Sequence, residues 1–275
     1  MAREIYKKFE SLSAFHSYVD KGQTQPNFVG HEDSKRETSY DNSFYGTKTY
    51  QEAEELLLNG DEQHANKIEK GGVARERKML KLDANRRKLF CDVTGVMPHV
   101  PNYIAGVPTT MVNARMIRQK QKVLNLVYNV SVNGSVGAKD MEDVAIKMLT
   151  AIMRCEANGV RINLYVCDIS EKSGQIIGWL LRIKSSGQHL DVLKAAYPLT
   201  NPAMLRRHSF RFTEILPGVR ASFVDSYGAA NRCADGLLKA CGVRNARTLS
   251  YYTMRGKDVN GIVEMILGGC DLLKN

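Results

Sequence analysis

Apolar and polar positions in the C-terminal half of the chain predict alternating strands and helices. An apolar run at residues 123–130 stops at a small polar loop, residues 131–137. Apolar residues then recur every three or four positions up to residue 155, which is typical of an amphipathic helix. We expect residues 124–130 to form a central buried strand with Leu126 inside, and Asp140 to cap the helix.

Two further apolar runs predict a hairpin beside this strand. Residues 160–167 alternate, and a turn-rich segment separates them from the apolar run at 176–183. This spacing predicts an antiparallel pair, with 176–183 at the sheet edge. The later pattern predicts a helix at 188–197 ended by Pro198, a helix capped by Asn201, helical spacing at 227–240, a strand at 247–254 and a closing helix at 257–267.

The order strand, helix, strand, short turn, strand resembles the start of a von Willebrand factor A domain. The resemblance covers residues 122–275 and implies an α/β, Rossmann-like, mainly parallel sheet with one antiparallel edge strand. In that family the first strand ends in an Asp-x-Ser-x-Ser motif that binds a divalent metal, and the matching residues here are Asn129, Ser131 and Asn133. Two of the three positions depart from the pattern, and Asn in place of Asp removes charge that would help bind the ion. We therefore expect a solvated loop without a tightly held metal, with metal binding as the alternative.

The residue pattern of the N-terminal third differs from that of the rest of the chain and predicts a separate arm. Residues 1–15 have the spacing of an amphipathic helix, whereas residues 21–46 are polar and indicate a loop whose order depends on a partner. Thr49 and Glu52 form a capping box ahead of a short helix ended by Asn59-Gly60, and Asp61 is expected to cap another. The predicted domains are an arm with short helices at 1–72, a basic connector at 73–121 and the α/β domain at 122–275.

Positive charge is concentrated in the connector. The chain carries a net charge of +10, and residues 66–122 hold thirteen basic and four acidic residues, a local excess of +9. Such a segment is a candidate for contact with phosphate or with an acidic partner. The candidate binding residues are Arg75, Arg77, Lys78, Arg86, Arg87, Lys88, Arg115, Arg118 and Lys120. Arg206, Arg207, His208 and Arg211 are candidates to extend this patch.

Residues 89–108, between the basic clusters, predict one strand followed by a loop punctuated by proline and glycine, with His99 on that loop. Together with the segments at 45–47, 52–60 and 197–207, this loop resembles an uncharacterised family of phage and prophage proteins with a von Willebrand A-like C-terminal half. That resemblance implies origin and provides no catalytic residues.

The sequence contains no recognisable enzyme motif, and we expect no catalytic residues and no cofactor. It has no phosphate-binding loop, nucleophile elbow or zinc helix. Six cysteines are scattered without a C-x-x-C pair, which indicates buried reduced thiols. Asp168, Glu171 and Asp191 lie near predicted strand ends, but paired-carboxylate catalysis depends on distances that the sequence does not give.

These patterns favour a non-enzymatic, phage-encoded macromolecular binding or assembly protein, with a protein partner or self-assembly. One alternative is an RNA- or DNA-binding protein that uses the basic connector, and a second is an enzyme with a dispersed site. The longest apolar runs fall below the roughly 18 residues that span a bilayer, and the first residues lack the apolar core of a secretory signal. We therefore expect no membrane partner, and a location in the cytoplasm of a bacterial host or in a virion.

Overall fold

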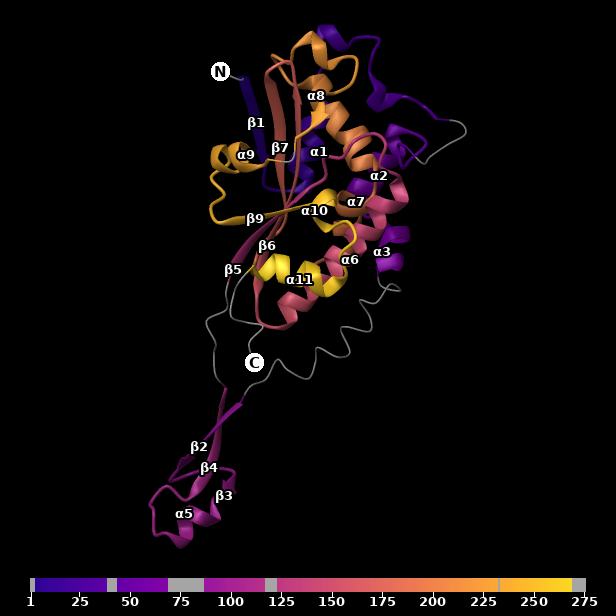
Figure 1. Ribbon diagram of the computed structural model, residues 1–275. Coiled ribbons are helices and arrows are strands. Elements are labelled where there is room, and N and C mark those ends of the chain that lie inside the picture. Colours follow the sequence, from indigo (N-terminus) through magenta and orange to yellow (C-terminus); the bar gives the residue numbers. More distant parts are fainter. Residues whose placement is uncertain (1–2, 39–43, 69–86, 117–122, 232, 269–275) are drawn as a thin grey trace.

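A mixed sheet forms the centre of the protein (Figure 1). The computed structural model describes residues 3–38, 44–68, 87–116, 123–231 and 233–268, and for residues 87–88 and 114–116 it describes the backbone alone. The strand order is β1-β7-β6-β5-β9, with β8 paired to β6. The strands are β1 (Arg3–Phe9), β5 (Val123–Asn129), β6 (Arg161–Lys172), β7 (Gln175–Lys184), β8 (Ala229–Ala230) and β9 (Ala246–Ser250).

The predicted central strand is confirmed. β5 pairs in parallel with β6 on one side and with β9 on the other, and Leu126 is 1% exposed. The hairpin is also confirmed, since β6 and β7 are antiparallel and are joined through Ser173 and Gly174, both with left-handed backbone. Most strand pairs of this sheet are parallel, as an α/β fold requires.

The predicted edge position of β7 is wrong, because β1 pairs in parallel with its outer side. The prediction of a helix over residues 1–15 is wrong for the same reason. Residues Arg3–Phe9 complete the hydrogen bonds of the edge of β7, and tertiary pairing overrides the helical spacing. The helix begins later, at α1 (Leu12–Lys21), where the Ser11 hydroxyl accepts a hydrogen bond from the Ala14 amide at 3.2 Å.

Helices cover the two faces of the sheet unequally (Figure 1). One face packs against the main helical layer, and the other carries a smaller apolar cluster under α9 (Asp235–Ala240). The main layer contains α1, α2 (Tyr50–Asn59), α3 (Glu62–Ile68), α6 (Ala138–Ala157), α7 (Val192–Thr200), the π-helix η4 (Met204–Ser209), α8 (Phe210–Ile215), α10 (Tyr251–Met254) and α11 (Val259–Leu267). Short 3-10 helices form η1 (Pro26–Phe28), η2 (Asp33–Lys35) and η5 (Ala221–Phe223).

The N-terminal segment belongs to the same core. Phe15, Phe28 and Leu57 are buried in one cluster with Trp179 of β7. The Phe15 and Trp179 rings lie 5.0 Å apart. Residues predicted as an arm therefore provide an edge strand, helices and core side chains to the α/β body.

Several helix predictions are confirmed and others need correction. α2 and α3 begin after their predicted caps Thr49 and Asp61, and α11 matches the closing helix. Pro198 does not end its helix, because α7 runs through it and stops at Thr200; the proline removes one amide donor near the helix end. Asp140 does not cap α6, which begins after Gly137 with no side-chain cap and holds Asp140 in its first turn.

The later predictions hold in part. Of the predicted strand at 247–254, residues up to Ser250 lie in β9, and α10 follows directly, started by a capping box of Ser250 and Thr253. Within residues 227–240 the helix is limited to α9, and the start of that stretch forms β8.

Residues 87–116 form a small antiparallel sheet in place of the expected single strand and loop. Its order is β2-β4-β3, built from β2 (Arg87–Asp92), β3 (Met97–Pro98) and β4 (Met111–Met116), with α5 (Val100–Ile104) between β3 and β4. The His99 imidazole caps α5 by accepting the Asn102 amide at 3.3 Å, and Pro101 lies in its first turn. The proline that suggested a loop therefore helps to start a helix.

Candidate functional site

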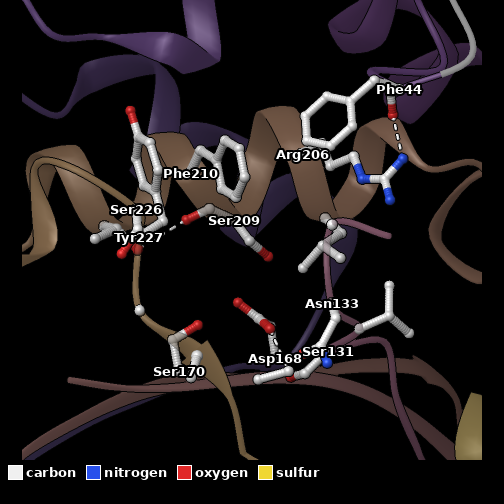
Figure 2. A pocket seen from close by; sticks show the side chains of 17 residues that line it. Phe44, Ser131, Asn133, Asp168, Ser170, Arg206, Ser209, Phe210, Ser226 and Tyr227 are labelled. Carbon is white, nitrogen blue, oxygen red and sulfur yellow. Dashed lines mark hydrogen bonds between the residues drawn. The ribbon is translucent and has the colours of Figure 1, made fainter. Parts of the chain in front are cut away.

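A cavity of about 350 Å³ lies where strand β5 ends (Figure 2). Its floor comes from the loop after β5 and from β6, which contribute Ser131, Asp168 and Ser170. Helices η4 and α8 lie over it and contribute Arg206, Ser209 and Phe210, as Figure 2 shows. Open α/β sheets place ligand sites outside the carboxyl ends of their strands, and this cavity has that position.

The loop residues singled out in the sequence hold the cavity floor together. Asn129 accepts the Ser131 amide at 2.9 Å through Oδ1 and donates to the Asn231 carbonyl at 3.0 Å through Nδ2. The Ser131 hydroxyl accepts the Ile169 amide at 2.8 Å and donates to Asp168 Oδ1 at 2.6 Å. The amide of Asn133 donates to the Tyr252 hydroxyl at 2.9 Å. Ser131 thus joins the loop after β5 to β6, and Asn129 joins the end of β5 to the segment after β8.

The expected absence of a tight metal at this loop stays a prediction. Within the described ranges, no group of three or more His, Cys, Asp or Glu residues is arranged to hold a metal ion. Asn129 and Ser131 are buried and their polar atoms are used in internal hydrogen bonds.

Asp168 is the buried carboxyl of this site. Its residue is 6% exposed, and burial raises the pKa of the carboxyl. Hydrogen bonds from the hydroxyls of Ser131 and Ser209 and from the amide of Ile169 partly oppose that rise in pKa, and no charged neighbour in the described part of the chain contributes to it. Burial of an unpaired charge is costly, so this environment favours the neutral form of the carboxyl as long as no cation lies beside it.

Arg206 brings a buried positive charge to the same cavity. Its guanidinium donates to the Phe44 carbonyl at 2.6 Å and to the Val136 carbonyl at 2.8 Å, and it stacks on the Phe44 ring at 4.1 Å. Desolvation lowers the pKa of this guanidinium. These partners are neutral carbonyls and an aromatic ring, so they accept two of the five N–H donors of the guanidinium without supplying a carboxylate to match its charge.

The prediction that Arg206, Arg207, His208 and Arg211 extend a basic surface is wrong, because all four are buried. Arg211 donates to the Thr24 hydroxyl and to the Gly22 carbonyl. Glu214, on the same helix, accepts from Ser34 and Tyr227. These charged side chains bind the polar segment of residues 22–48 to the helical layer, so the described part of that segment is held from within the chain.

His208 illustrates how deeply this helix is buried. Its ring stacks between Phe15 and Tyr50, and Nδ1 lies 3.0 Å from the Tyr197 hydroxyl. Desolvation lowers the pKa of His208 to about 3. The folded protein therefore keeps this imidazole neutral at physiological pH.

We predict that His208 makes the protein less stable in mild acid. An unfolded histidine has a pKa of about 6.5, so as the pH falls the unfolded chain binds this proton before the folded one. The free energy of unfolding should be highest above pH 7 and lose about 2 kcal/mol between pH 7 and pH 5 through His208. Urea unfolding at several pH values should show this slope flattened in His208→Gln. The matched control His31→Gln, at an exposed position, should keep the full slope; an unchanged slope in His208→Gln would contradict the assignment.

Most of the predicted basic site cannot be placed in the fold. Arg75, Arg77, Lys78, Arg86, Arg118 and Lys120 lie outside the described residues. Arg87 and Lys88 lie in β2 and Arg115 in β4, where the backbone alone is described. The register places Lys88 opposite Arg115.

The other candidate chemical residues make structural contacts. Asp191 caps α7 by accepting the Lys194 amide at 3.2 Å, and Glu171 accepts from the Asn231 side chain at 2.9 Å. Asp168 and Glu171 lie an odd number of positions apart on β6, so they point to opposite faces of the sheet. Of the cysteines within the described ranges, Cys155 and Cys167 are buried, whereas Cys233 is exposed.

The small sheet presents the second candidate site, an apolar surface. Val96, Tyr103 and Ile104 are 84%, 75% and 78% exposed, and α5 contains no buried residue. Other large apolar side chains of the small sheet are exposed as well: Leu89, Phe90, Val93, Met97, Val100 and Val107. Sequence reasoning missed this surface because an apolar stretch with prolines is also typical of a packed loop. So many exposed apolar side chains on a short module indicate a docking surface.

The comparisons with known proteins give a family without a known activity. A family model described as "Domain of unknown function (DUF7192)" matches residues 2–274. The chain belongs to this family. No curated protein and no solved structure matches it. Among the residues that the structure describes, no helix has the length and apolar character to cross a bilayer.

Proposed function

We propose that this DUF7192 protein is a non-enzymatic assembly protein that binds a second copy of itself through residues 87–116. The exposed apolar surface of the small sheet is the observation that carries the proposal. A two-fold contact between identical surfaces would bury both at once. Each fully buried aliphatic or aromatic side chain contributes about 1.5–3 kcal/mol, so several of them are needed to offset the roughly 4–15 kcal/mol that association costs.

Strand β2 offers the edge for such pairing. It lies at the outside of the β2-β4-β3 sheet, so one side of its backbone has no strand partner in the described structure. Free edges readily accept a strand from another chain. Antiparallel pairing of β2 with its copy would join the two small sheets into one continuous sheet.

Charge along β2 favours the antiparallel arrangement. The strand begins with Arg87 and Lys88 and ends with Asp92. A two-fold pairing centred between Leu89 and Phe90 puts Arg87 of one copy opposite Asp92 of the other. Opposite charges across a strand pair stabilise it, whereas a parallel pairing would align like charges.

A disulfide-trapping experiment tests this pairing. The same register puts position 88 opposite Cys91 of the second copy. The variant Lys88→Cys should therefore form a disulfide-linked dimer under mild oxidation, because directly opposed positions have Cβ atoms about 4.5–5.5 Å apart.

The control for trapping is the double variant Lys88→Cys, Cys91→Ser, which should give far less covalent dimer on non-reducing gels. Equal yields in the two variants would contradict the proposed register, and no covalent dimer in either would contradict the pairing. The wild-type chain, which keeps Cys91, gives the background.

The proposal also includes the two family resemblances found in the sequence, to the von Willebrand factor A domain and to phage proteins. We infer that the α/β body is von Willebrand A-like, supported by the strand, helix, strand, hairpin order of β5, α6, β6 and β7. The position of β1 outside β7 departs from that pattern. A phage origin, with a location in the bacterial cytoplasm or in a virion, rests on the loose motifs at 45–47, 52–60, 89–108 and 197–207.

A further inference from the structure

The cavity above β5 and β6 is lined by a buried carboxyl group and a buried guanidinium that are not hydrogen-bonded to each other. Among the described residues Asp168 accepts from the Ser131 hydroxyl and forms no ion pair, and the guanidinium of Arg206 donates to carbonyl groups. Both residues line the same space of about 350 Å³ (Figure 2). Buried charges are ordinarily compensated, so this arrangement points to a ligand that supplies both counter-charges.

The neutral lining residues are largely committed to internal contacts. The Ser209 hydroxyl accepts the Trp179 indole N–H at 3.0 Å, and the Thr213 hydroxyl donates to the Ser209 carbonyl at 3.1 Å. The Ser226 hydroxyl accepts from Lys172 at 2.7 Å. The charged groups of Asp168 and Arg206 are therefore the main anchors that the cavity offers a ligand.

The apolar part of the lining is preformed. The rings of Phe210 and Tyr227 stack with centroids 4.0 Å apart, and the Tyr227 hydroxyl donates to Glu214 at 2.7 Å. Gly228, with left-handed backbone, brings the chain close to β6, and a Cβ there would lie 2.8 Å from the Phe223 ring. Rigid apolar walls with a few charged groups are typical of a small-molecule site.

We propose that this cavity binds a small zwitterion, a free α-amino acid, with its ammonium group on the Asp168 carboxylate and its carboxylate towards Arg206. The amino-acid side chain would lie against Phe210 and Leu205. A simple amine would leave Arg206 without a counter-charge, and a simple carboxylate would leave Asp168 without the cation that its ionised form requires.

Thermal unfolding of the full chain with single ligands tests the proposal. The probes are each of the common L-amino acids at 10 mM, with ethanolamine as the amine-only probe and acetate as the carboxylate-only probe. At least one amino acid should raise the Tm of the wild-type protein by about 3 °C, as expected for a ligand at roughly ten times its Kd. Ethanolamine and acetate should not. A shift by ethanolamine as large as that by any amino acid would overturn the zwitterion, and no shift by any amino acid would overturn the site.

Two variants connect binding to this cavity. Asp168→Asn keeps the shape of the side chain and removes its charge, and calorimetric titration with the active amino acid should show an affinity at least about 30-fold lower. The matched control Asp191→Asn makes the same change at the cap of α7, away from the cavity, and should bind as the wild type does. Ser170→Leu should fill the cavity and abolish binding while the protein stays folded. Unchanged affinity in both Asp168→Asn and Ser170→Leu would overturn the proposal.

Discussion

The variant Arg207→Ala should lower the free energy of unfolding by about 3–5 kcal/mol, the largest stability loss that we expect from replacing one charged side chain of this protein. Arg207 is fully buried. Its guanidinium makes five hydrogen bonds at 2.7–3.1 Å, to Thr47 Oγ1 and to the carbonyls of Ser34, Arg36, Thr47 and Lys48. Removal of the side chain leaves a cavity and several carbonyl groups without their donor.

In Arg207→Ala, the segment that holds the acceptors of Arg207 should open locally more readily than the whole protein unfolds. The acceptors of Arg207 all lie in residues 34–48, so amide hydrogen exchange should accelerate at Lys35, Arg36 and residues 47–48 in the variant. Arg207→Lys should recover only part of the loss, because an ammonium offers three donors and cannot match the planar fork of a guanidinium.

Urea unfolding of the wild type, Arg207→Ala and the matched control Arg255→Ala measures this effect. Arg255 is exposed, and its loss should change the free energy of unfolding by less than about 0.5 kcal/mol. A difference below about 1 kcal/mol between Arg207→Ala and Arg255→Ala would contradict the role assigned to Arg207.

The second large effect concerns self-association. The variant Leu89→Asp should weaken dimer formation at least about 100-fold, because it puts a charge at the centre of the proposed antiparallel pair of β2 strands. The Leu89 side chain is 64% exposed in the single chain. Its replacement should therefore leave the free energy of unfolding of the monomer nearly unchanged.

The control for this variant is Val29→Asp, an equally polar change at a side chain that is 65% exposed in the α/β body. Sedimentation velocity over a concentration series gives the dissociation constant of each protein. Equal dissociation constants for Leu89→Asp and for Val29→Asp would exclude the edge of β2 as the interface.

Much of the sheet was predictable because its strands have clear local patterns. β5, β6 and β7 have apolar runs bounded by turn residues, and periodicity identifies such runs. β1 was not predictable in this way, because Arg3–Phe9 has few apolar residues and is ordered by pairing with β7, a strand far away in the sequence.

The candidate sites were predictable only in part, because burial is a tertiary property. Ser131 and Asn129 could be predicted as site residues because they lie at the end of a buried strand. Asp168 lines the cavity only because the fold brings it under helices η4 and α8. The cluster Arg206, Arg207 and His208 has the sequence of a basic surface and is buried instead. The donors of Arg207 are matched by carbonyls from residues 34–48, a pairing that no local pattern encodes.

The molar mass of the wild-type full chain in solution, measured by size-exclusion chromatography with light scattering and with absorbance at 260 nm, tests the proposed assembly most directly. We expect a mass of twice the 30.8 kDa of one chain at micromolar concentration, an absorbance ratio typical of protein alone, and a monomer for Leu89→Asp. A wild-type mass of 30.8 kDa at every concentration would contradict self-assembly, and a larger mass that appears only with strong absorbance at 260 nm would favour nucleic acid as the partner in place of a second copy.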